Sequence, residues 1–156
     1  MKVIRRLLLF VPLLLIASWG LAAPSATTGA GAVDAAWVKA FKANDLEAVM
    51  GCYAPDAVVW LPDAPEAKGA QAIRESYQAL FSANTVQAVA LSETHYATVG
   101  NRSIGWGKFS MTMVPKATGT AAVATGRFTV VAEKRGGKWL YTVDHASMNP
   151  PPAPKK

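Results

Sequence analysis

The spacing of apolar residues predicts that the folded part of the chain begins with a helix. From residue 33 to residue 41 the apolar positions recur every three or four residues, as on one face of a helix. Asn44 is expected to end this helix and to cap the next one. Glu47 follows three positions later, where its carboxylate can reach back to a free backbone amide, so the pair has the pattern of a capping box.

Two further helices and a short strand are expected in the first half of the chain. Apolar residues at helical spacing predict a second helix over residues 46–53, which Pro55 should end. Residues 57–61 form a compact apolar run, typical of a strand. The segment 62–68 contains two prolines and three charged residues and is expected to be a surface loop. A third helix is predicted from residue 69 until Asn84.

The second half of the chain changes to the two-residue period of strands. In the segment around Phe109, apolar residues alternate with polar ones, which indicates a sheet with one solvated face. Gly105-Trp106-Gly107 in the same segment predicts a bend or bulge. Glycine-containing turns separate the strands. The four strands expected are residues 86–99, 103–114, 126–134 and 138–147.

The first residues have the pattern of a secretory signal peptide. A basic start is followed by an apolar run that is too short to span a membrane comfortably, and small residues follow, with a cleavage site near Ala22. The predicted organisation is a signal peptide (1–22), a flexible lead-in (23–32), one domain (33–148) and a Pro-rich tail (149–156). We therefore expect a periplasmic or secreted protein that meets the membrane only transiently, through its signal peptide.

Charge and cysteine content argue against several classes of protein. The formal charge is +6, and it falls to +3 when the three basic residues of the signal peptide are removed. The remaining basic residues are scattered, which does not support nucleic-acid binding. Cys52 is the single cysteine, so no internal disulfide can form, and we expect it to be a buried apolar residue inside the second helix.

Three segments carry a resemblance to a known family: AFKANDLEAVMGCYAPDAVVWLP, GAQAIRESYQALF and GKWLYTVDHAS. They resemble the nuclear-transport-factor-2-like superfamily, in particular its polyketide-cyclase-like and ketosteroid-isomerase-like bacterial branch with a SnoaL-like domain. The resemblance covers residues 33–147. It implies an α+β fold in which a curved antiparallel sheet forms a cone around three N-terminal helices, as in cystatin-like proteins. It also implies an apolar pocket at the open end, but one such scaffold hosts many activities.

The resemblance does not extend to the functional residues of ketosteroid isomerase. The tyrosine of that enzyme's first helix corresponds to Trp37, its general base to Leu61, and its protonated aspartic acid to the neighbourhood of Gly126. None of these side chains can act as a base or donate to an oxyanion through a hydroxyl or carboxyl group. If the protein is an enzyme, we therefore expect an isomerase- or cyclase-like reaction by another mechanism.

Candidate site residues follow from the implied cone. His145 lies in phase with Tyr141 on the last strand, so both are expected to face the pocket, while Asp144 should face away. His145 is the candidate catalytic residue, and the alternative is a structural histidine near the sheet edge. The two histidines are far apart and Cys52 has no partner cysteine, so we predict neither a metal site nor a cofactor. The pocket expected from the family geometry consists of Trp37, Leu61, Tyr77, Phe128, Tyr141 and His145.

Three functions remain open at this point. The first is an exported homodimer whose cone binds a small apolar or amphipathic ligand. The second is an isomerase, cyclase or dehydratase that uses His145. The third is an oligomerisation or partner-binding module, for which the solvated sheet face around Lys108 and Trp106 would be the contact surface.

Overall fold

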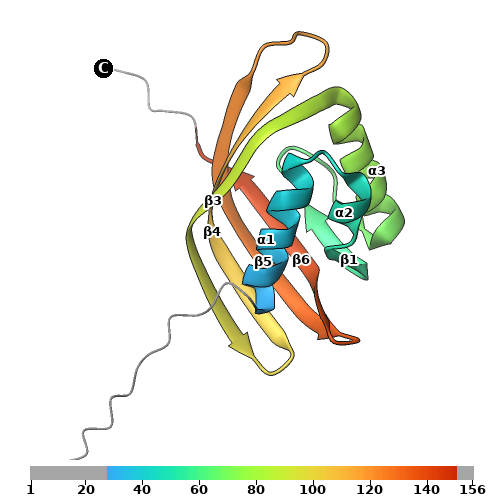
Figure 1. Ribbon diagram of the computed structural model, residues 1–156, viewed down its shortest axis with the longest axis vertical. Coiled ribbons are helices and arrows are strands. Elements are labelled where there is room, and N and C mark those ends of the chain that lie inside the picture. Colours follow the sequence, from blue (N-terminus) through green and yellow to red (C-terminus); the bar gives the residue numbers. More distant parts are fainter. Residues whose placement is uncertain (1–27, 151–156) are drawn as a thin grey trace, which may run out of the picture.

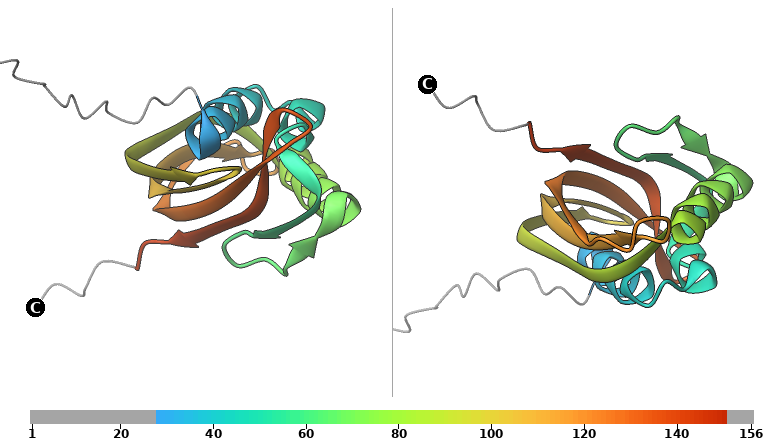
Figure 2. Two further views of the ribbon diagram at one scale, coloured as in Figure 1. Left: turned by 90° about the horizontal axis from the view of Figure 1, so that it is seen from below. Right: turned by 90° about the horizontal axis from the view of Figure 1, so that it is seen from above.

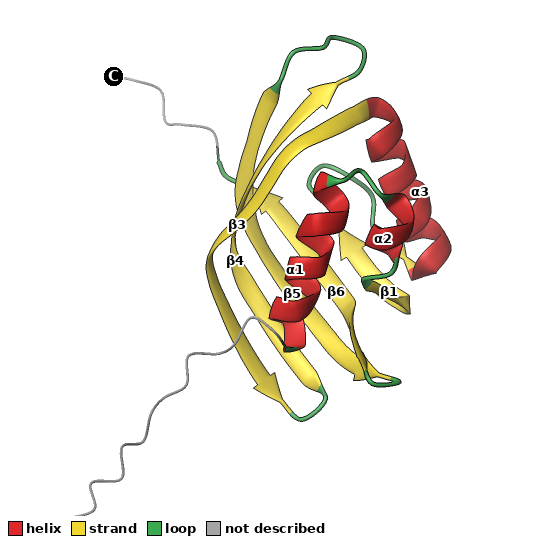
Figure 3. Cartoon of the chain, viewed as in Figure 1, coloured by secondary structure: helices red, strands yellow, loops and turns green. Residues whose placement is uncertain are grey.

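The computed structural model describes residues 28–150 and shows three helices packed against one six-stranded sheet (Figure 1). The strand order across the sheet is β2-β1-β6-β5-β4-β3. Helices precede most of the sheet in the chain, and all strand pairs are antiparallel except β1 with β6 (Figure 3). The elements are α1 (Gly29–Lys42), α2 (Leu46–Met50), β1 (Tyr53–Trp60), β2 (Ala67–Lys68), α3 (Gly69–Ala83), β3 (Asn84–Val99), β4 (Arg102–Pro115), β5 (Ala122–Arg135) and β6 (Lys138–Met148).

The sheet is strongly curved, and the helices lie on its concave side (Figure 2). Helix α1 packs across β3 to β6, while α3 packs against β1. Glycines permit close packing where the sheet bends: a Cβ on Gly105 would lie 3.0 Å from the ring of Tyr96, and one on Gly107 would lie 2.9 Å from the ring of Phe128. The bulge predicted near these glycines lies in the partner strand, between Ser92 and His95. The predicted α+β cone is confirmed.

The first two helices differ from the sequence prediction. Helix α1 begins at Gly29, so residues 29–32 belong to it and not to a flexible lead-in. The cap of α2 is Asp45, whose carboxylate accepts a hydrogen bond from the amide of Ala48 at 3.0 Å. The predicted capping role of Asn44 is wrong, because its side chain instead bonds the backbone N–H and C=O of Val86 on β3, at 2.8 and 3.0 Å.

Helix α2 is also shorter than the apolar spacing predicts. It ends at Met50, and the chain turns through Gly51 and Cys52 into β1, which starts at Tyr53 and contains Pro55. The placement of Cys52 within a helix is therefore wrong, although its predicted burial is correct. The early start of β1 brings Tyr53 into the sheet, directly opposite Tyr141 of β6.

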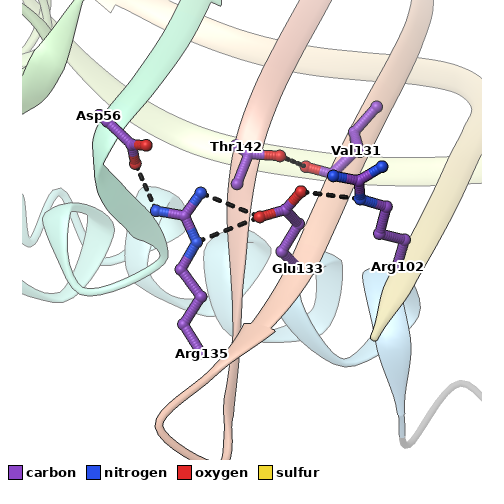
Figure 4. Close-up of polar contacts among 6 residues, drawn as sticks. All are labelled: Asp56, Arg102, Val131, Glu133, Arg135 and Thr142. Atoms are coloured by element: carbon purple, nitrogen blue, oxygen red, sulfur yellow. Dashed lines mark hydrogen bonds and ion pairs between the residues drawn. The ribbon is translucent and has the colours of Figure 1, made fainter. Parts of the chain in front are cut away.

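Strand β6 contains one extra residue that reverses the alternation of its side chains. Tyr141 pairs with Ala132 and Val143 pairs with Val131, so Thr142 has no partner of its own in the ladder. Its hydroxyl donates to the carbonyl of Val131 at 3.3 Å (Figure 4). A bulge of this kind shifts every later residue of the strand to the opposite face.

Ion pairs tie the strands together at the β5–β6 turn (Figure 4). The guanidinium of Arg135 bonds Asp56 of β1 and also Glu133, at 2.5 and 2.9 Å. Glu133 in turn accepts from Arg102 of β4 at 3.0 Å. These pairs are largely exposed, so each contributes little to stability, but together they fix β1 against the hairpin.

Two predictions concern residues outside the described part of the chain. The signal peptide (1–22) with its cleavage site near Ala22 lies there, and so does the end of the Pro-rich tail (151–156). Within residues 28–150, no helix is long and apolar enough to cross a membrane.

Candidate functional site

A cavity of about 530 Å³ lies between the helices and the concave face of the sheet. Side chains of α1, α3 and strands β3 to β6 line it, together with the loop after β1. The wall is mainly apolar and includes Leu91, Met111 and Met113. One end is closed by fully buried residues such as Tyr77, and the other is bordered by the exposed residues 63–65 and Met148.

Five of the six residues predicted to form the pocket line this cavity. They come from five different elements or loops, which only the folded chain brings together: Trp37, Leu61, Tyr77, Phe128 and Tyr141. Trp37 stacks on Phe41 with ring centroids 4.6 Å apart, and both residues line the cavity.

The predicted position of His145 in the pocket is wrong. The bulge at Thr142 turns His145 to the convex face of the sheet, where it is exposed and packs edge-to-face on Trp60 with ring centroids 6.1 Å apart. The same shift turns Asp144, predicted to face away, into the cavity. The strand alternation that placed His145 beside Tyr141 holds only as far as the bulge.

A chain of hydrogen bonds runs across the closed end of the cavity to Asp144. The indole N–H of Trp37 donates to the hydroxyl of Tyr77 at 3.1 Å, and the hydroxyls of Tyr77 and Tyr53 lie 2.6 Å apart. Tyr53 donates to Oδ2 of Asp144, also at 2.6 Å. Because Tyr53 has a single proton and gives it to the carboxylate, Tyr77 must be the donor in the middle bond.

Asp34 of α1 is a second buried carboxylate at the closed end. Its Oδ1 accepts from the hydroxyl of Tyr141, and its Oδ2 accepts from Tyr96 at 2.7 Å. Both oxygens of Asp34 are therefore engaged. Oδ1 of Asp144 differs, since no described residue donates to it. No buried side-chain oxygen of the described residues lacks a partner, so this atom must be open to the cavity.

Burial dominates the electrostatics of both carboxyl groups. It raises the pKa of Asp144 from 3.8 to about 6. The hydrogen bond from Tyr53 lowers this pKa, and the nearby charge of Asp34 raises it further. Burial also raises the pKa of Asp34, against the hydrogen bonds from Tyr141 and Tyr96. A carboxyl group whose pKa is close to neutral can change its protonation state when a ligand binds, so Asp144 is a candidate functional group of the cavity.

Two other residues with reactive side chains, Cys52 and His95, do not line the cavity. Burial raises the pKa of the Cys52 thiol to about 11, so the environment does not activate it as a nucleophile. His95 is exposed on the convex face and stacks on Trp106 with ring centroids 5.6 Å apart. Among residues 28–150, no three histidine, cysteine or acidic side chains lie close enough together to hold a metal ion.

The positions that correspond to ketosteroid isomerase carry no acid or base. Leu61 contributes only apolar surface to the cavity. Gly126 has no room for any side chain, because a Cβ there would lie 2.1 Å from the carbonyl oxygen of Ser147. The buried acidic groups of the cavity, Asp34 and Asp144, come instead from α1 and β6.

The sequence contained a signal for one of these carboxylates. Asp34 lies three and seven residues before Trp37 and Phe41, on the same helical face, and a charged residue within an apolar face indicates a buried polar contact. Asp144 had no such signal, because its orientation depends on the bulge at Thr142.

Comparison with known proteins identifies the family. The model of the SnoaL-like domain family matches residues 35–142, most of the chain. The protein therefore belongs to the SnoaL-like family, within the nuclear-transport-factor-2-like and ketosteroid-isomerase-like superfamily. No match was found among the curated proteins.

Solved structures share the fold. A ketosteroid isomerase-like protein from Erwinia carotovora is 25% identical, with a TM-score of 0.69 over 77% of this chain and 93% of the other. A proposed calcium/calmodulin-dependent protein kinase II association domain from Xanthomonas campestris is 24% identical, with a TM-score of 0.70 over 83% and 94%. A nuclear transport factor 2-like protein from Salmonella enterica is 17% identical, with a TM-score of 0.67 over 80% and 89%.

Proposed function

We propose that the protein is exported and binds a small, largely apolar molecule in its cone. The observation that carries the proposal is the open cavity of about 530 Å³, whose size and apolar wall are typical of small-molecule sites. A domain without a ligand to hold gains stability by filling such a space with side chains. The export half of the proposal rests on the sequence pattern of residues 1–22.

Native mass spectrometry of the protein from the exported fraction tests both halves. It reports the mass of the mature chain, and we expect a retained molecule of a few hundred daltons. The matched variants Ala146→Phe and Ala90→Phe then locate the site. Ala146 lines the cavity, whereas Ala90 is exposed on β3. The first variant should lose the bound molecule and the second should keep it; retention by both would contradict binding in the cone.

A second candidate function is proton transfer by Asp144. It is supported by the raised pKa of this carboxyl group and by its Oδ1, which no described residue occupies. Such a base would serve an isomerisation, cyclisation or dehydration. The described residues of the cavity wall offer no free side-chain hydroxyl or N–H to stabilise an oxyanion, so binding is the better-supported function. Deuterium exchange into a bound cyclic ketone, abolished in Asp144→Asn, would favour the enzyme.

The convex face of the sheet supports a homodimer. One residue from each of five neighbouring strands forms a continuous row of direct partners across it. All five side chains are exposed, and two of them are tryptophans, a residue type enriched at protein interfaces. We define this aromatic row as Trp60, His145, Thr129, Trp106 and His95. A second copy of the chain would cover it.

A further inference from the structure

Every side-chain hydrogen-bond donor among the described residues of the cavity wall already has an acceptor within the protein. The indole N–H of Trp37 is bonded to Tyr77, whose own hydroxyl donates to Tyr53. The hydroxyl of Tyr141 donates to Asp34, and that of Ser76 donates to the carbonyl of Ala72 at 3.0 Å. A ligand carbonyl or carboxylate would therefore find no free side-chain donor.

The free hydrogen-bonding group of the cavity wall is an acceptor, the carboxylate oxygen Oδ1 of Asp144. Asp144 is nine-tenths buried, and its single hydrogen bond from Tyr53 occupies Oδ2, while Oδ1 opens into the cavity. A buried carboxylate with one donor is incompletely compensated for its lost hydration. Oδ1 therefore favours a ligand that brings a donor, and a positively charged donor most of all.

The charges around the cavity have one sign. Three carboxyl groups, those of Asp34, Asp63 and Asp144, line it, and no lysine, arginine or histidine is among the described lining residues. The other titratable groups that influence the closed end are the buried thiol of Cys52 and four phenols, those of Tyr53, Tyr77, Tyr96 and Tyr141, whose charged forms are also negative. No cation of the described protein lies there to neutralise Asp144.

We propose that the ligand of this cavity is an apolar amine, bound as its ammonium cation to Oδ1 of Asp144. The hydrocarbon part lies against the apolar wall, and the N⁺–H group supplies both the missing donor and the missing charge. An alcohol of the same shape supplies the donor only. A carboxylate of the same shape is repelled by the negative charge and has no side-chain donor to bind.

This inference rests on the proposed binding function, and the test separates the two. The probes are 1-adamantylmethylamine, 1-adamantanemethanol and 1-adamantanecarboxylate, which share one cage and differ in the polar group. Their dissociation constants would be measured by calorimetry at neutral to slightly alkaline pH. We expect the amine to bind about tenfold more tightly than the alcohol, since a charge-assisted hydrogen bond is about twice as strong as a neutral one. The carboxylate should bind most weakly.

Two variants and the pH dependence assign the preference to Asp144. Asp144→Asn should remove the difference between amine and alcohol, whereas Asp63→Asn, which changes an exposed carboxylate at the mouth, should keep it. In the unmodified protein the amine should lose affinity as the pH falls below the range where Asp144 is ionised, while the alcohol should not. This measurement needs no variant to fold.

The outcomes are distinct. If the alcohol or the carboxylate binds as tightly as the amine, or if Asp144→Asn keeps the preference, the inference is wrong and the binding function stands. If none of the three probes binds, and Ala146→Phe changes nothing in the mass spectrum, the inference and the binding function are both overturned.

Discussion

Tyr53 and Asp144, 91 residues apart in the chain, meet at the closed end of the cavity, where the hydroxyl of Tyr53 donates to Oδ2 of Asp144 at 2.6 Å. The contact joins the first and last long strands of the sheet. It depends on two irregularities, the early start of β1 and the bulge at Thr142 in β6. The buried carboxyl group of Asp144 is therefore positioned where strand geometry departs from regular alternation.

Tyr53→Phe should destabilise the fold by about 1–3 kcal/mol, because it leaves the hydroxyl of Tyr77 without an acceptor and Asp144 with no donor. Since the bond from Tyr53 lowers the pKa of Asp144, its loss should raise that pKa further. Urea denaturation and carboxyl ¹³C NMR measure the two effects. Tyr96→Phe is the control, because the hydroxyl of Tyr96 bonds Asp34 and not Asp144. An equal change of the Asp144 pKa in both variants would contradict the role of the Tyr53 hydrogen bond.

Asp144→Asn should stabilise the protein at pH values above the pKa of Asp144. The folded-state pKa of about 6 exceeds the usual 3.8, so the contribution of Asp144 to stability is complete below about pH 4 and is lost as the pH rises through 6. At about 1.4 kcal/mol per pKa unit, the loss reaches at most about 3 kcal/mol. The amide still accepts from Tyr53 but carries no charge.

Urea denaturation of Asp144→Asn and the unmodified protein at acidic and alkaline pH checks this expectation. The advantage of the variant should be present at alkaline pH and absent at acidic pH. Asp63→Asn, at an exposed position, should show no comparable dependence. A constant difference between Asp144→Asn and the unmodified protein would mean that the carboxyl group does not titrate as inferred.

His145→Ala should leave ligand affinity in the cone unchanged, because His145 lies on the convex face beside Trp60 and not in the cavity. Calorimetry with the ligand recovered from the exported protein provides the measurement. Asp144→Asn, one position earlier in the strand, is the matched comparison and should alter affinity. If His145→Ala lost ligand binding and Asp144→Asn kept it, His145 would belong to the binding site and the structural assignment would be wrong.

Gly126→Ala should destabilise the protein by about 3 kcal/mol, since the new Cβ would lie 2.1 Å from the carbonyl oxygen of Ser147 and 2.6 Å from the ring of Phe109. Neither neighbour is the free end of a flexible side chain. Thermal denaturation measures the effect. Gly51→Ala is the control: its Cβ would lie 3.3 Å from the nearest atom at an ordinary φ of −63°, so its effect should be much smaller. Equal melting temperatures for the two variants would contradict the packing argument.

Trp106→Ser should weaken the proposed homodimer, because Trp106 lies in the aromatic row and is 43% exposed in the isolated chain. Sedimentation velocity should show dimer for the unmodified protein and a larger monomer fraction for the variant. Val99→Ser removes a more exposed apolar side chain near the β3–β4 turn, outside the row, and should leave the dimer intact. A monomeric unmodified protein would exclude this assembly.

The amino-acid sequence by itself determined the fold family, the order of helices and strands, and five of the residues that line the cavity. The order of the elements follows from local periodicity and from turn and stop residues, which act over a few positions and can be read along the chain. The fold family and the expected pocket residues follow from the family resemblance that three segments of the sequence carry. The same local rules predicted a capping role for Asn44, but that side chain bonds Val86 of β3, a partner remote in the sequence.

Only the tertiary structure decided which polar side chains face the cavity. A single unpaired residue, Thr142, exchanged the orientations of Asp144 and His145, and strand pairing with Val131 and Ala132 sets that bulge. Because side chains in a strand alternate with a period of two, an insertion of one residue reverses every later position. The identity of the buried acid was therefore fixed by the register between β5 and β6, which no local pattern in the sequence encodes.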